Sequence, residues 1–339
     1  MKLRLLLAAL TVLSVTAVSA CGGSSPSGPA AVIALDGSST VFPISEAVAE
    51  EFQLQNAGMP VTVGVSGTGG GFKKFCRAET VISNASRPIS AGEITECTAA
   101  GIEFIELPVA YDGMAVVVNP KNTWANDITV AELKRLWEPA AQGKIMKWNQ
   151  VRDSWPDREI RLYGAGADSG TFDYFTEVIN GKAKASRGDF TPSEDDNVLV
   201  QGVAGDELAL GFMGLAYYVE NKDKLKLLGV DDEVATNGEG AITPSFESVR
   251  GGTYRPLSRP MFIYVSTKAL VERPEVKAFV DFYLANTATL TKEVGVVALA
   301  DAEVALVNAR YAAKTTGTIF DANDHTPKTL EQRLQGGTR

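Results

Sequence analysis

Residues 166–172 read GADSGTF. They are preceded by a run rich in β-branched and aromatic residues at 160–163 and continued by an amphipathic segment. This order predicts a strand, a tight turn and a helix whose first backbone amides point back into the turn. The amino end of a helix carries unpaired N–H groups and a partial positive charge, so it suits an anion. DGSSTVFP at 36–43 and SGTGGGF at 66–72 repeat the pattern. One such turn is typical of a plain helix N-cap, but three favour a shared site for one small oxyanion.

The composition is that of a globular protein with two ordinary domains. The chain has 339 residues, of which 45% are hydrophobic and 22% charged, and this balance argues against several membrane spans. The net charge is −9 and no long basic run is present. We therefore expect no nucleic-acid partner, since such binding depends on basic patches. Backbone amides and one buried arginine can still hold a small anion.

The first twenty residues have the pattern of an export signal. Lys2 and Arg4 precede an apolar stretch that is too short for a stable membrane span. The stretch ends at Val18-Ser19-Ala20-Cys21, which resembles a bacterial lipobox and implies cleavage before Cys21 and lipid attachment to its thiol. An ordinary signal peptide, with Cys21 incidental, is the alternative. Residues 21–30 then form a flexible tether, and the mature chain is extracytoplasmic and lipid-anchored to the cell membrane.

Two further cysteines, Cys76 and Cys97, remain for the mature domain. In an exported protein an even remainder predicts a disulfide, here one that closes a loop of about twenty residues and contributes roughly 3 kcal/mol. No Cys-x-x-Cys motif is present, so we expect a structural bond rather than a redox site.

Strand-like and helix-like patterns alternate along the chain. Thr129 and Glu132 have the spacing of a capping box at the start of one helix. Repeated strand–turn–helix units favour an α/β fold over an all-β or helical-bundle fold. The patterns predict strands at or within 32–35, 61–65, 81–90, 102–108, 115–118, 208–218 and 261–265, and helices at 43–52, 72–76, 129–137, 197–203, 274–286 and 299–312.

The sequence gives little support for a catalytic site. The one histidine, His325, lies in a polar C-terminal tail, which argues against a Ser-His-Asp triad, a Cys-His pair and a histidine zinc site. The glycine-rich 66–72 stretch lacks the Lys-Ser/Thr of a phosphate-binding P-loop. A two-carboxylate hydrolase is not excluded by counting, but no pair stands out. We expect no cofactor, no metal and no catalytic residue.

Arg87 is the candidate charged donor. It precedes Pro88, which restrains it to an extended backbone, and a guanidinium can bond two oxyanion atoms at once. The alternative is a surface arginine in a turn. Phosphate at neutral pH keeps a proton that sulfate lacks, so a buried carboxylate acceptor would favour phosphate. Asp168 is the first candidate for this role and Asp112 the second, with a helix cap or an ion pair to Arg87 as the alternative for Asp168.

Several stretches, in order along nearly the whole mature chain, resemble the PstS/SphX phosphate-binding proteins of phosphate-specific ABC transporters. These stretches are DGSSTVFPISEAVAEEF, VTVGVSGTGGGFKKFC, ISNASRPIS, ELPVAYDGMAVVVNP, ITVAELKRLWEPAAQGKIMKWNQV, GADSGTFDYFTEVI and LSRPMFIYVSTKAL.

The resemblance implies a type II periplasmic-binding-protein-like fold, in which two lobes, each a mixed sheet flanked by helices, are joined by a two-stranded hinge. Lobe 1 would comprise 31–111 plus 264–339, and lobe 2 would comprise 112–263. Carried over by motif, the phosphate ligands would be Ser39, Thr40, Val41, Thr68, Arg87, Ser169, Gly170 and Thr171.

The chain departs from the best-known members of this family at two positions. Arg87 stands where those members have Asp, and Ala165 stands where they have Arg. The resemblance therefore implies that the arginine has changed sides of the cleft, and it leaves the carboxylate acceptor undetermined.

These observations together predict a monomer that binds inorganic phosphate and delivers it to the subunits of an ABC permease, with no catalysis. Closure of the lobes by hinge motion would create the form that the permease recognises. The alternatives are binding of another tetrahedral oxyanion such as sulfate or molybdate, a secreted phosphatase, and a surface sensor or adhesin.

Overall fold

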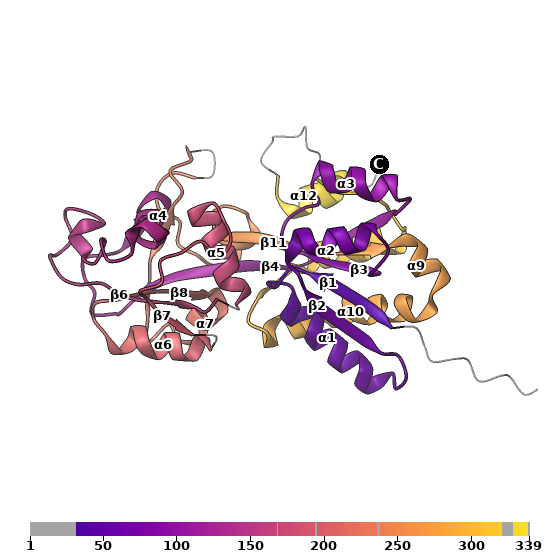
Figure 1. The fold of residues 1–339 in the computed structure, drawn as a ribbon, viewed down its shortest axis with the longest axis horizontal. Coiled ribbons are helices and arrows are strands. Elements are labelled where there is room, and N and C mark those ends of the chain that lie inside the picture. The colour runs from indigo at the N-terminus through magenta and orange to yellow at the C-terminus, as the bar shows by residue number, and fades with distance from the viewer. Residues whose placement is uncertain (1–31, 168, 194, 236–237, 321–327, 338–339) are drawn as a thin grey trace, which may run out of the picture.

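The computed structural model describes residues 32–167, 169–193, 195–235, 238–320 and 328–337. In these ranges the chain forms two α/β lobes, joined by the strands β4 (Phe104–Val118) and β11 (Ser258–Ser266) (Figure 1). The predicted two-lobed α/β fold with a two-stranded connection is confirmed. None of the helices within these ranges has the length and apolar content that crossing a membrane requires.

The strand β4 belongs to both lobes. Its residues 104–113 pair antiparallel with β11, and residues 114–118 pair antiparallel with β8, so one sheet runs through the molecule in the order β2-β1-β3-β11-β4-β8-β6-β7. The short strands β9 and β12 add to β4, and β10 pairs separately with β5. The remaining strands are β1 (Ile33–Gly37), β2 (Val61–Val65), β3 (Ile82–Ala85), β5 (Asp127–Thr129), β6 (Arg161–Ala165), β7 (Thr191–Ser193), β8 (Ala209–Gly214), β9 (Lys226–Leu227), β10 (Gly229–Asp231) and β12 (Val297–Ala298).

Helices cover the faces of this sheet in both lobes (Figure 1). The predicted capping box of Thr129 and Glu132 is present at the start of α4. The helices are α1 (Phe42–Gln55), α2 (Gly67–Cys76), α3 (Ala91–Ala99), α4 (Val130–Trp137), α5 (Gly170–Asn180), α6 (Asp196–Gly205), α7 (Leu215–Glu220), α8 (Phe246–Arg250), α9 (Thr267–Glu272), α10 (Pro274–Glu293), α11 (Asp301–Ala312) and α12 (Leu330–Gly336).

Parallel pairing sets where the helices begin. In lobe 1, β1 pairs in parallel with β2 and β3, so the carboxyl ends of these strands lie at one edge. The helices α1 and α2 follow β1 and β2 directly and therefore begin at that edge. In lobe 2, β6 is parallel to β7 and β8 and leads into α5 in the same way. The three turns singled out in the sequence are thus the three strand–helix junctions of these units.

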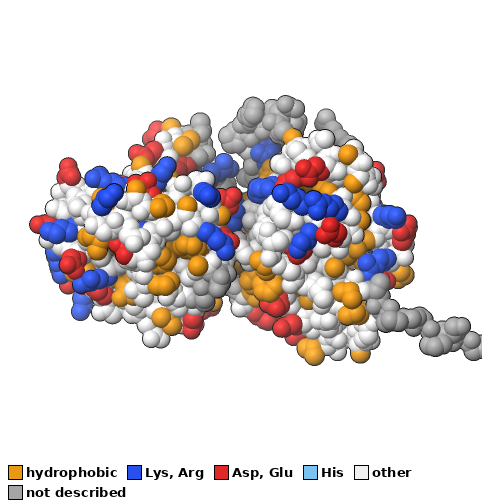
Figure 2. All heavy atoms as spheres, viewed as in Figure 1, with side chains coloured by type: hydrophobic (Ala, Val, Ile, Leu, Met, Phe, Trp, Pro, Cys, Tyr) orange, Lys and Arg blue, Asp and Glu red, His pale blue; other side chains and the backbone are white. Residues whose placement is uncertain are grey.

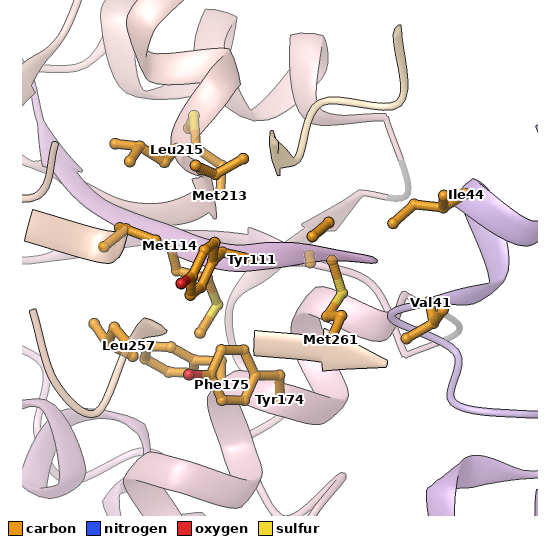
Figure 3. Close-up of a cluster of buried hydrophobic side chains, with 14 of the residues drawn as sticks. Val41, Ile44, Tyr111, Met114, Tyr174, Phe175, Met213, Leu215, Leu257 and Met261 are labelled. Carbon is orange, nitrogen blue, oxygen red and sulfur yellow. The ribbon is translucent and has the colours of Figure 1, made fainter. Parts of the chain in front are cut away.

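Buried side chains from both lobes pack around β4. Figure 3 shows Tyr111 and Met114 of this strand in a cluster that also contains Phe175 and Met213 from lobe 2. The ring of Phe175 stacks on Phe212 with centroids 3.9 Å apart. The hydrophobic core therefore continues through the connection between the lobes. Burial of each side chain of this size contributes about 1.5–3 kcal/mol to stability.

The main error in the predicted elements concerns β4. The sequence predicted two strands, at 102–108 and 115–118, where the structure has one strand of 15 residues that is buried throughout. A charged residue such as Asp112 is untypical of a buried strand, but here it lies opposite Arg259 in the register of β11. A neighbour with opposite charge allows the strand to continue through a buried carboxylate.

The pair formed by Asp112 and Arg259 is loose. Asp112 Oδ2 lies 3.8 Å from Arg259 Nε, which is longer than a hydrogen bond. Burial raises the pKa of Asp112 to about 6, against the opposing effect of Arg259. The ionised form of Asp112 is therefore costly in the folded protein.

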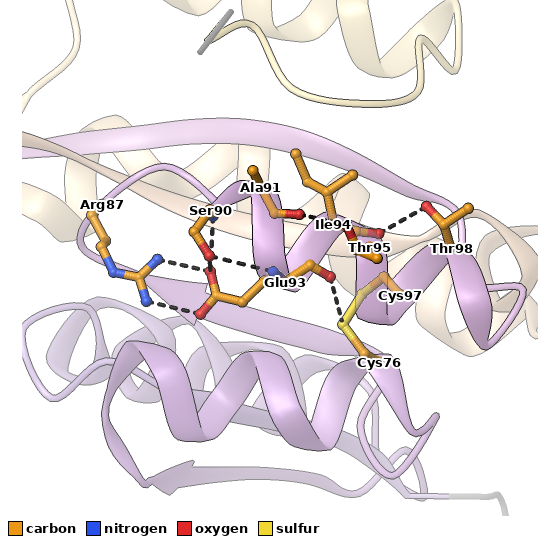
Figure 4. Close-up of a disulfide and its surroundings, with 9 residues drawn as sticks. All are labelled: Cys76, Arg87, Ser90, Ala91, Glu93, Ile94, Thr95, Cys97 and Thr98. Carbon is orange, nitrogen blue, oxygen red and sulfur yellow. Dashed lines mark hydrogen bonds and ion pairs between the residues drawn. A yellow bond between two sulfur atoms is a disulfide. The ribbon is translucent and has the colours of Figure 1, made fainter.

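The predicted disulfide is confirmed. Cys76, the last residue of α2, is bonded to Cys97 in α3, and their Cα atoms lie 4.3 Å apart (Figure 4). Both cysteines are buried in a small hydrophobic cluster with Phe72 and Tyr264. The bond therefore cross-links two neighbouring helices of lobe 1.

Replacing both cysteines by alanine should lower the stability of the protein. The bond closes a loop spanning a sequence separation of 21, so its loss should lower the free energy of unfolding by about 3 kcal/mol. The midpoint of urea unfolding measures this change. Reduced wild-type protein serves as the control, since it loses the bond without a change of side chain. An unchanged midpoint in both samples would contradict the prediction.

Asp112→Asn should change how stability depends on pH. Because the folded-state pKa is raised, the stability due to neutral Asp112 is complete below its ordinary pKa and is lost as pH rises through about 6. The variant stays neutral, so its stability relative to wild type should increase by up to about 3 kcal/mol between about pH 4 and about pH 7. Urea unfolding across this range measures the difference, with the exposed Asp153→Asn as control. A pH-independent difference would show that the carboxyl titrates normally.

Candidate functional site

A cavity of about 190 Å³ lies between the lobes, where α1, α2 and α5 begin. It adjoins a larger opening of about 650 Å³, with which it shares Ser86, Arg87, Glu177 and Arg259. Figure 2 shows the groove between the lobes, with Lys and Arg side chains on both sides. The cavity is lined by Ser38, Ser39, Thr40, Gly67, Thr68, Gly69, Ser86, Arg87, Asp173, Glu177, Ala183 and Arg259.

The three helices that begin at this cavity differ in how their first amides are bonded. Among the described residues, no side chain caps the start of α1 or of α2. Ser66 precedes α2, but its hydroxyl donates to Asp36 instead of accepting from the helix. The first amides of α2 therefore remain available to an anion, whereas in α1 Pro43 has no N–H and the amide of Phe42 donates to the carbonyl of Ser38 at 3.0 Å. The third helix, α5, is capped by Ser169, whose Oγ accepts from the amide of Thr171 at 3.2 Å.

The two lobes touch at the starts of α1 and α5. A Cβ atom on Gly170 would lie 2.6 Å from the amide nitrogen of Thr40, so only glycine allows this approach. Thr40 Oγ1 donates to the carbonyl oxygen of Gly170 at 3.3 Å, and Ser39 Oγ donates to Asp173 Oδ2 at 3.4 Å. The structure thus brings the predicted residues Ser39, Thr40 and Gly170 together.

Thr68 and Ser86 form one wall of the cavity. The hydroxyl groups of Thr68 and Ser86 lie 3.1 Å apart, and the amide of Ser86 donates to Thr68 Oγ1 at 3.2 Å. This contact joins the start of α2 to the loop after β3, and it places hydroxyl groups beside Arg87. Ser86 was not singled out in the sequence.

Arg87 lines the cavity, but its charge is already paired. Its Nη1 and Nη2 donate to the two carboxylate oxygens of Glu93 at 2.9 and 2.8 Å (Figure 4). Nη1 also donates to the carbonyl of Pro88. The hydrogen bonds to Glu93 raise the pKa of Arg87 above its ordinary value. Burial acts to raise the pKa of Glu93, but hydrogen bonds from Arg87 and Ser90 hold it below its usual value. Arg87 keeps donors for an anion but brings a counter-charge with it.

Arg259 is the functional candidate that the sequence analysis missed. Its side chain is 14% exposed, and its guanidinium lies over the ring of Tyr174. In the described part of the chain its one hydrogen bond is from Nη2 to Thr40 Oγ1, at 3.1 Å. Asp112 and Glu177 lie 3.8 and 3.6 Å away, too far for hydrogen bonds. Arg259 therefore presents a largely buried positive charge whose donors are mostly unused.

A repeated tripeptide could have revealed Arg259. Ser86-Arg87-Pro88 follows β3, and Ser258-Arg259-Pro260 begins β11. The two strands are antiparallel neighbours with Phe262 opposite Ala85, so both tripeptides lie at the same end of the pair. This arrangement places two arginines side by side at the cavity.

The other predicted site residues that the structure describes do not line the cavity. Val41, Ser169, Gly170 and Thr171 lie at the starts of α1 and α5, beside the cavity and outside its lining. Asp112 lies behind Arg259 and does not line the cavity that the described residues form. Asp168 lies outside the described residues, as does Cys21. Ala165, at the end of β6, is buried.

The carboxylates that do line the cavity are Asp173 and Glu177, one turn apart on α5. Neither was predicted from the sequence. The site therefore combines two arginines, uncapped helix amides, several hydroxyl groups and two carboxylates.

A family model described as a PBP superfamily domain matches residues 24–287. The chain is 50% identical over 305 residues to Protein SphX of Synechococcus elongatus, covering 90% of this chain and 88% of that protein. It is 37% identical over 266 residues to the phosphate-binding protein PstS of Staphylococcus saprophyticus, covering 78% and 79%.

A solved structure, of "a possible phosphate binding protein" from Planctomyces limnophilus, is similar over the fold. It superposes with a TM-score of 0.79 at 47% identity, and the match covers 84% of this chain and 98% of that one. The motifs quoted from the sequence, the two-lobed fold and these matches agree. The chain belongs to the PBP superfamily and, within it, to the family of the SphX and PstS proteins.

Proposed function

We propose that this protein binds inorganic phosphate in the cavity between its lobes and passes it to an ABC permease. The observation that carries the proposal is the position of Arg259 and Arg87 at a cavity where α1 and α2 begin without side-chain caps. Directed amides and hydroxyl groups match the four oxygens of a tetrahedral anion, and the arginines supply charge. The name of the Staphylococcus relative, a phosphate-binding protein, supports the same ligand.

The site residues of this proposal come from both lobes. Thr68 and Arg87 would hold the anion from lobe 1, together with the backbone of Ser39, Thr40 and Val41. The start of α5 would close on it from lobe 2 with Ser169, Gly170 and Thr171. Arg259 joins this set as the donor at the connection between the lobes, because its guanidinium is held by only one hydrogen bond from the described residues.

The proposed lobe boundaries follow the two connecting strands. Lobe 1 comprises 31–111 plus 264–339 and lobe 2 comprises 112–263, so the chain crosses within β4 and within β11. Asp112 and Arg259 are opposite each other on these strands, next to the proposed hinge. Ligand contacts to Arg259 would thus couple occupancy of the cavity to closure.

The proposed cellular setting rests on the amino-terminal residues. Residues 1–20 would be removed as a signal peptide, Cys21 would carry the lipid, and 21–30 would link the membrane to the domain. The protein would act outside the cytoplasm as a monomer. It would not catalyse a reaction, so wild-type protein should release no product from a chromogenic phosphate ester. Residues 1–30, on which this setting depends, lie outside the described ranges.

Titration calorimetry with phosphate tests the proposal. Wild-type protein should bind one phosphate, and Arg259→Ala should weaken binding by about 10- to 100-fold, as expected for loss of hydrogen bonds between charged groups. Arg87→Ala should cost less, because Glu93 already pairs with its charge.

Arg161→Ala is the matched control, since Arg161 is an exposed arginine on β6 that pairs with Glu159. This control should bind phosphate as wild type does. Full affinity in Arg259→Ala would remove Arg259 from the site, and no heat from the wild type with phosphate would overturn the proposed ligand.

A further inference from the structure

Asp173 is an under-bonded carboxylate in the wall of the cavity. It lies in the first turns of α5 and its side chain is 26% exposed. Oδ2 accepts one long hydrogen bond, from Ser39 at 3.4 Å, and Oδ1 is buried with no hydrogen-bond partner among the described residues. An ionised carboxylate can accept about four hydrogen bonds, so most of this capacity is unused.

Both positively and negatively charged side chains lie near Asp173. Lys184 Nζ lies 3.9 Å from Oδ1, while Arg259 and Arg87 line the same cavity. Glu177 lies one turn further along α5. Burial raises the pKa of Asp173 above its ordinary value, against the opposing effects of Lys184 and Ser39.

A carboxylate beside an anion repels it unless a hydrogen lies between the two oxygens. Phosphate keeps at least one P–OH group at neutral pH and can donate it to a carboxylate, whereas sulfate has no hydrogen to donate. A cavity wall with an unsatisfied acceptor therefore favours the anion that brings its own donor.

We infer that Asp173 is the specificity-determining residue of this site: its carboxylate accepts the hydrogen of bound phosphate and excludes sulfate. The inference rests on the proposed phosphate function and deepens it. It assigns the acceptor to α5, in lobe 2, opposite the wall that carries Arg87.

The other carboxylates near the cavity fit this role less well. Glu93 uses both oxygens on Arg87, and Asp112 does not line the cavity formed by the described residues. Glu177 is 51% exposed and faces Arg259 at 3.6 Å, at the boundary with the larger opening. Asp173 alone of these combines a place in the lining with a buried oxygen that lacks a partner in the described ranges.

The test compares phosphate, arsenate and sulfate binding by calorimetry in wild type and Asp173→Asn. The amide of asparagine can donate to a fully deprotonated anion. The variant should therefore gain measurable sulfate binding. It should also lose about 10- to 100-fold in affinity for phosphate and arsenate, because the charged acceptor of their hydrogen is replaced by a neutral one. Asp153→Asn, the same change at an exposed position of lobe 2, should leave all three affinities unchanged.

The pH dependence of the wild type gives a second test that needs no variant. As pH falls through the pKa of Asp173, its carboxyl becomes an O–H donor, so sulfate binding should appear at low pH in wild type. Asp112, which faces Arg259, also titrates near pH 6, so the sulfate affinity of Asp173→Asn should rise with falling pH, but by less than that of the wild type.

Unchanged phosphate-to-sulfate selectivity in Asp173→Asn, or absence of sulfate binding by wild type at low pH, would overturn the role of Asp173 and leave phosphate binding intact. Absence of phosphate binding by wild type would instead overturn the proposed function itself.

Discussion

The sharing of β4 between two lobes is the constraint on which the rest of the structure depends. Its first ten residues pair with β11 and its last five with β8, so the sheets of both lobes are fixed to one buried strand. The helices α1, α2 and α5 begin at strand ends on either side of this shared strand. The meeting of their amino ends, and hence the cavity, follows from strand pairing and not from contacts between the helices alone.

The cavity brings two arginines together in a protein of net charge −9. The two arginines there are held differently: Arg87 is paired by close hydrogen bonds to Glu93, whereas Arg259 has looser ion pairs to Asp112 and Glu177, at 3.8 and 3.6 Å, and lies over an aromatic ring. Burial of a guanidinium is costly unless its N–H groups are hydrogen-bonded, and the donors that Arg259 leaves unused could be satisfied by an anion in the cavity.

The parts of the fold and site that could be predicted are those set by neighbours in sequence. GADSGTF and the two similar turns identified strand–helix junctions, because glycine, hydroxyl residues and apolar periodicity are local signals. Arg259 was missed because it reaches Thr40 only through the pairing of β11 with β3 and β4, more than two hundred residues along the chain. The strand β4 was divided in two because Asp112 reads as a break until its partner across the sheet is known.

The Cys76–Cys97 bond has a consequence for how the cavity can deform. It ties α2 to α3, and Cys76 Sγ also lies 3.6 Å from the carbonyl of Glu93, the residue that holds Arg87. The wall that contains Thr68 and Arg87 is therefore cross-linked within lobe 1, while α5 of lobe 2 contacts the start of α1 at Ser39 and Thr40. The covalent bond thus braces the side of the cavity that carries Arg87, and no disulfide among the described residues braces the α5 side.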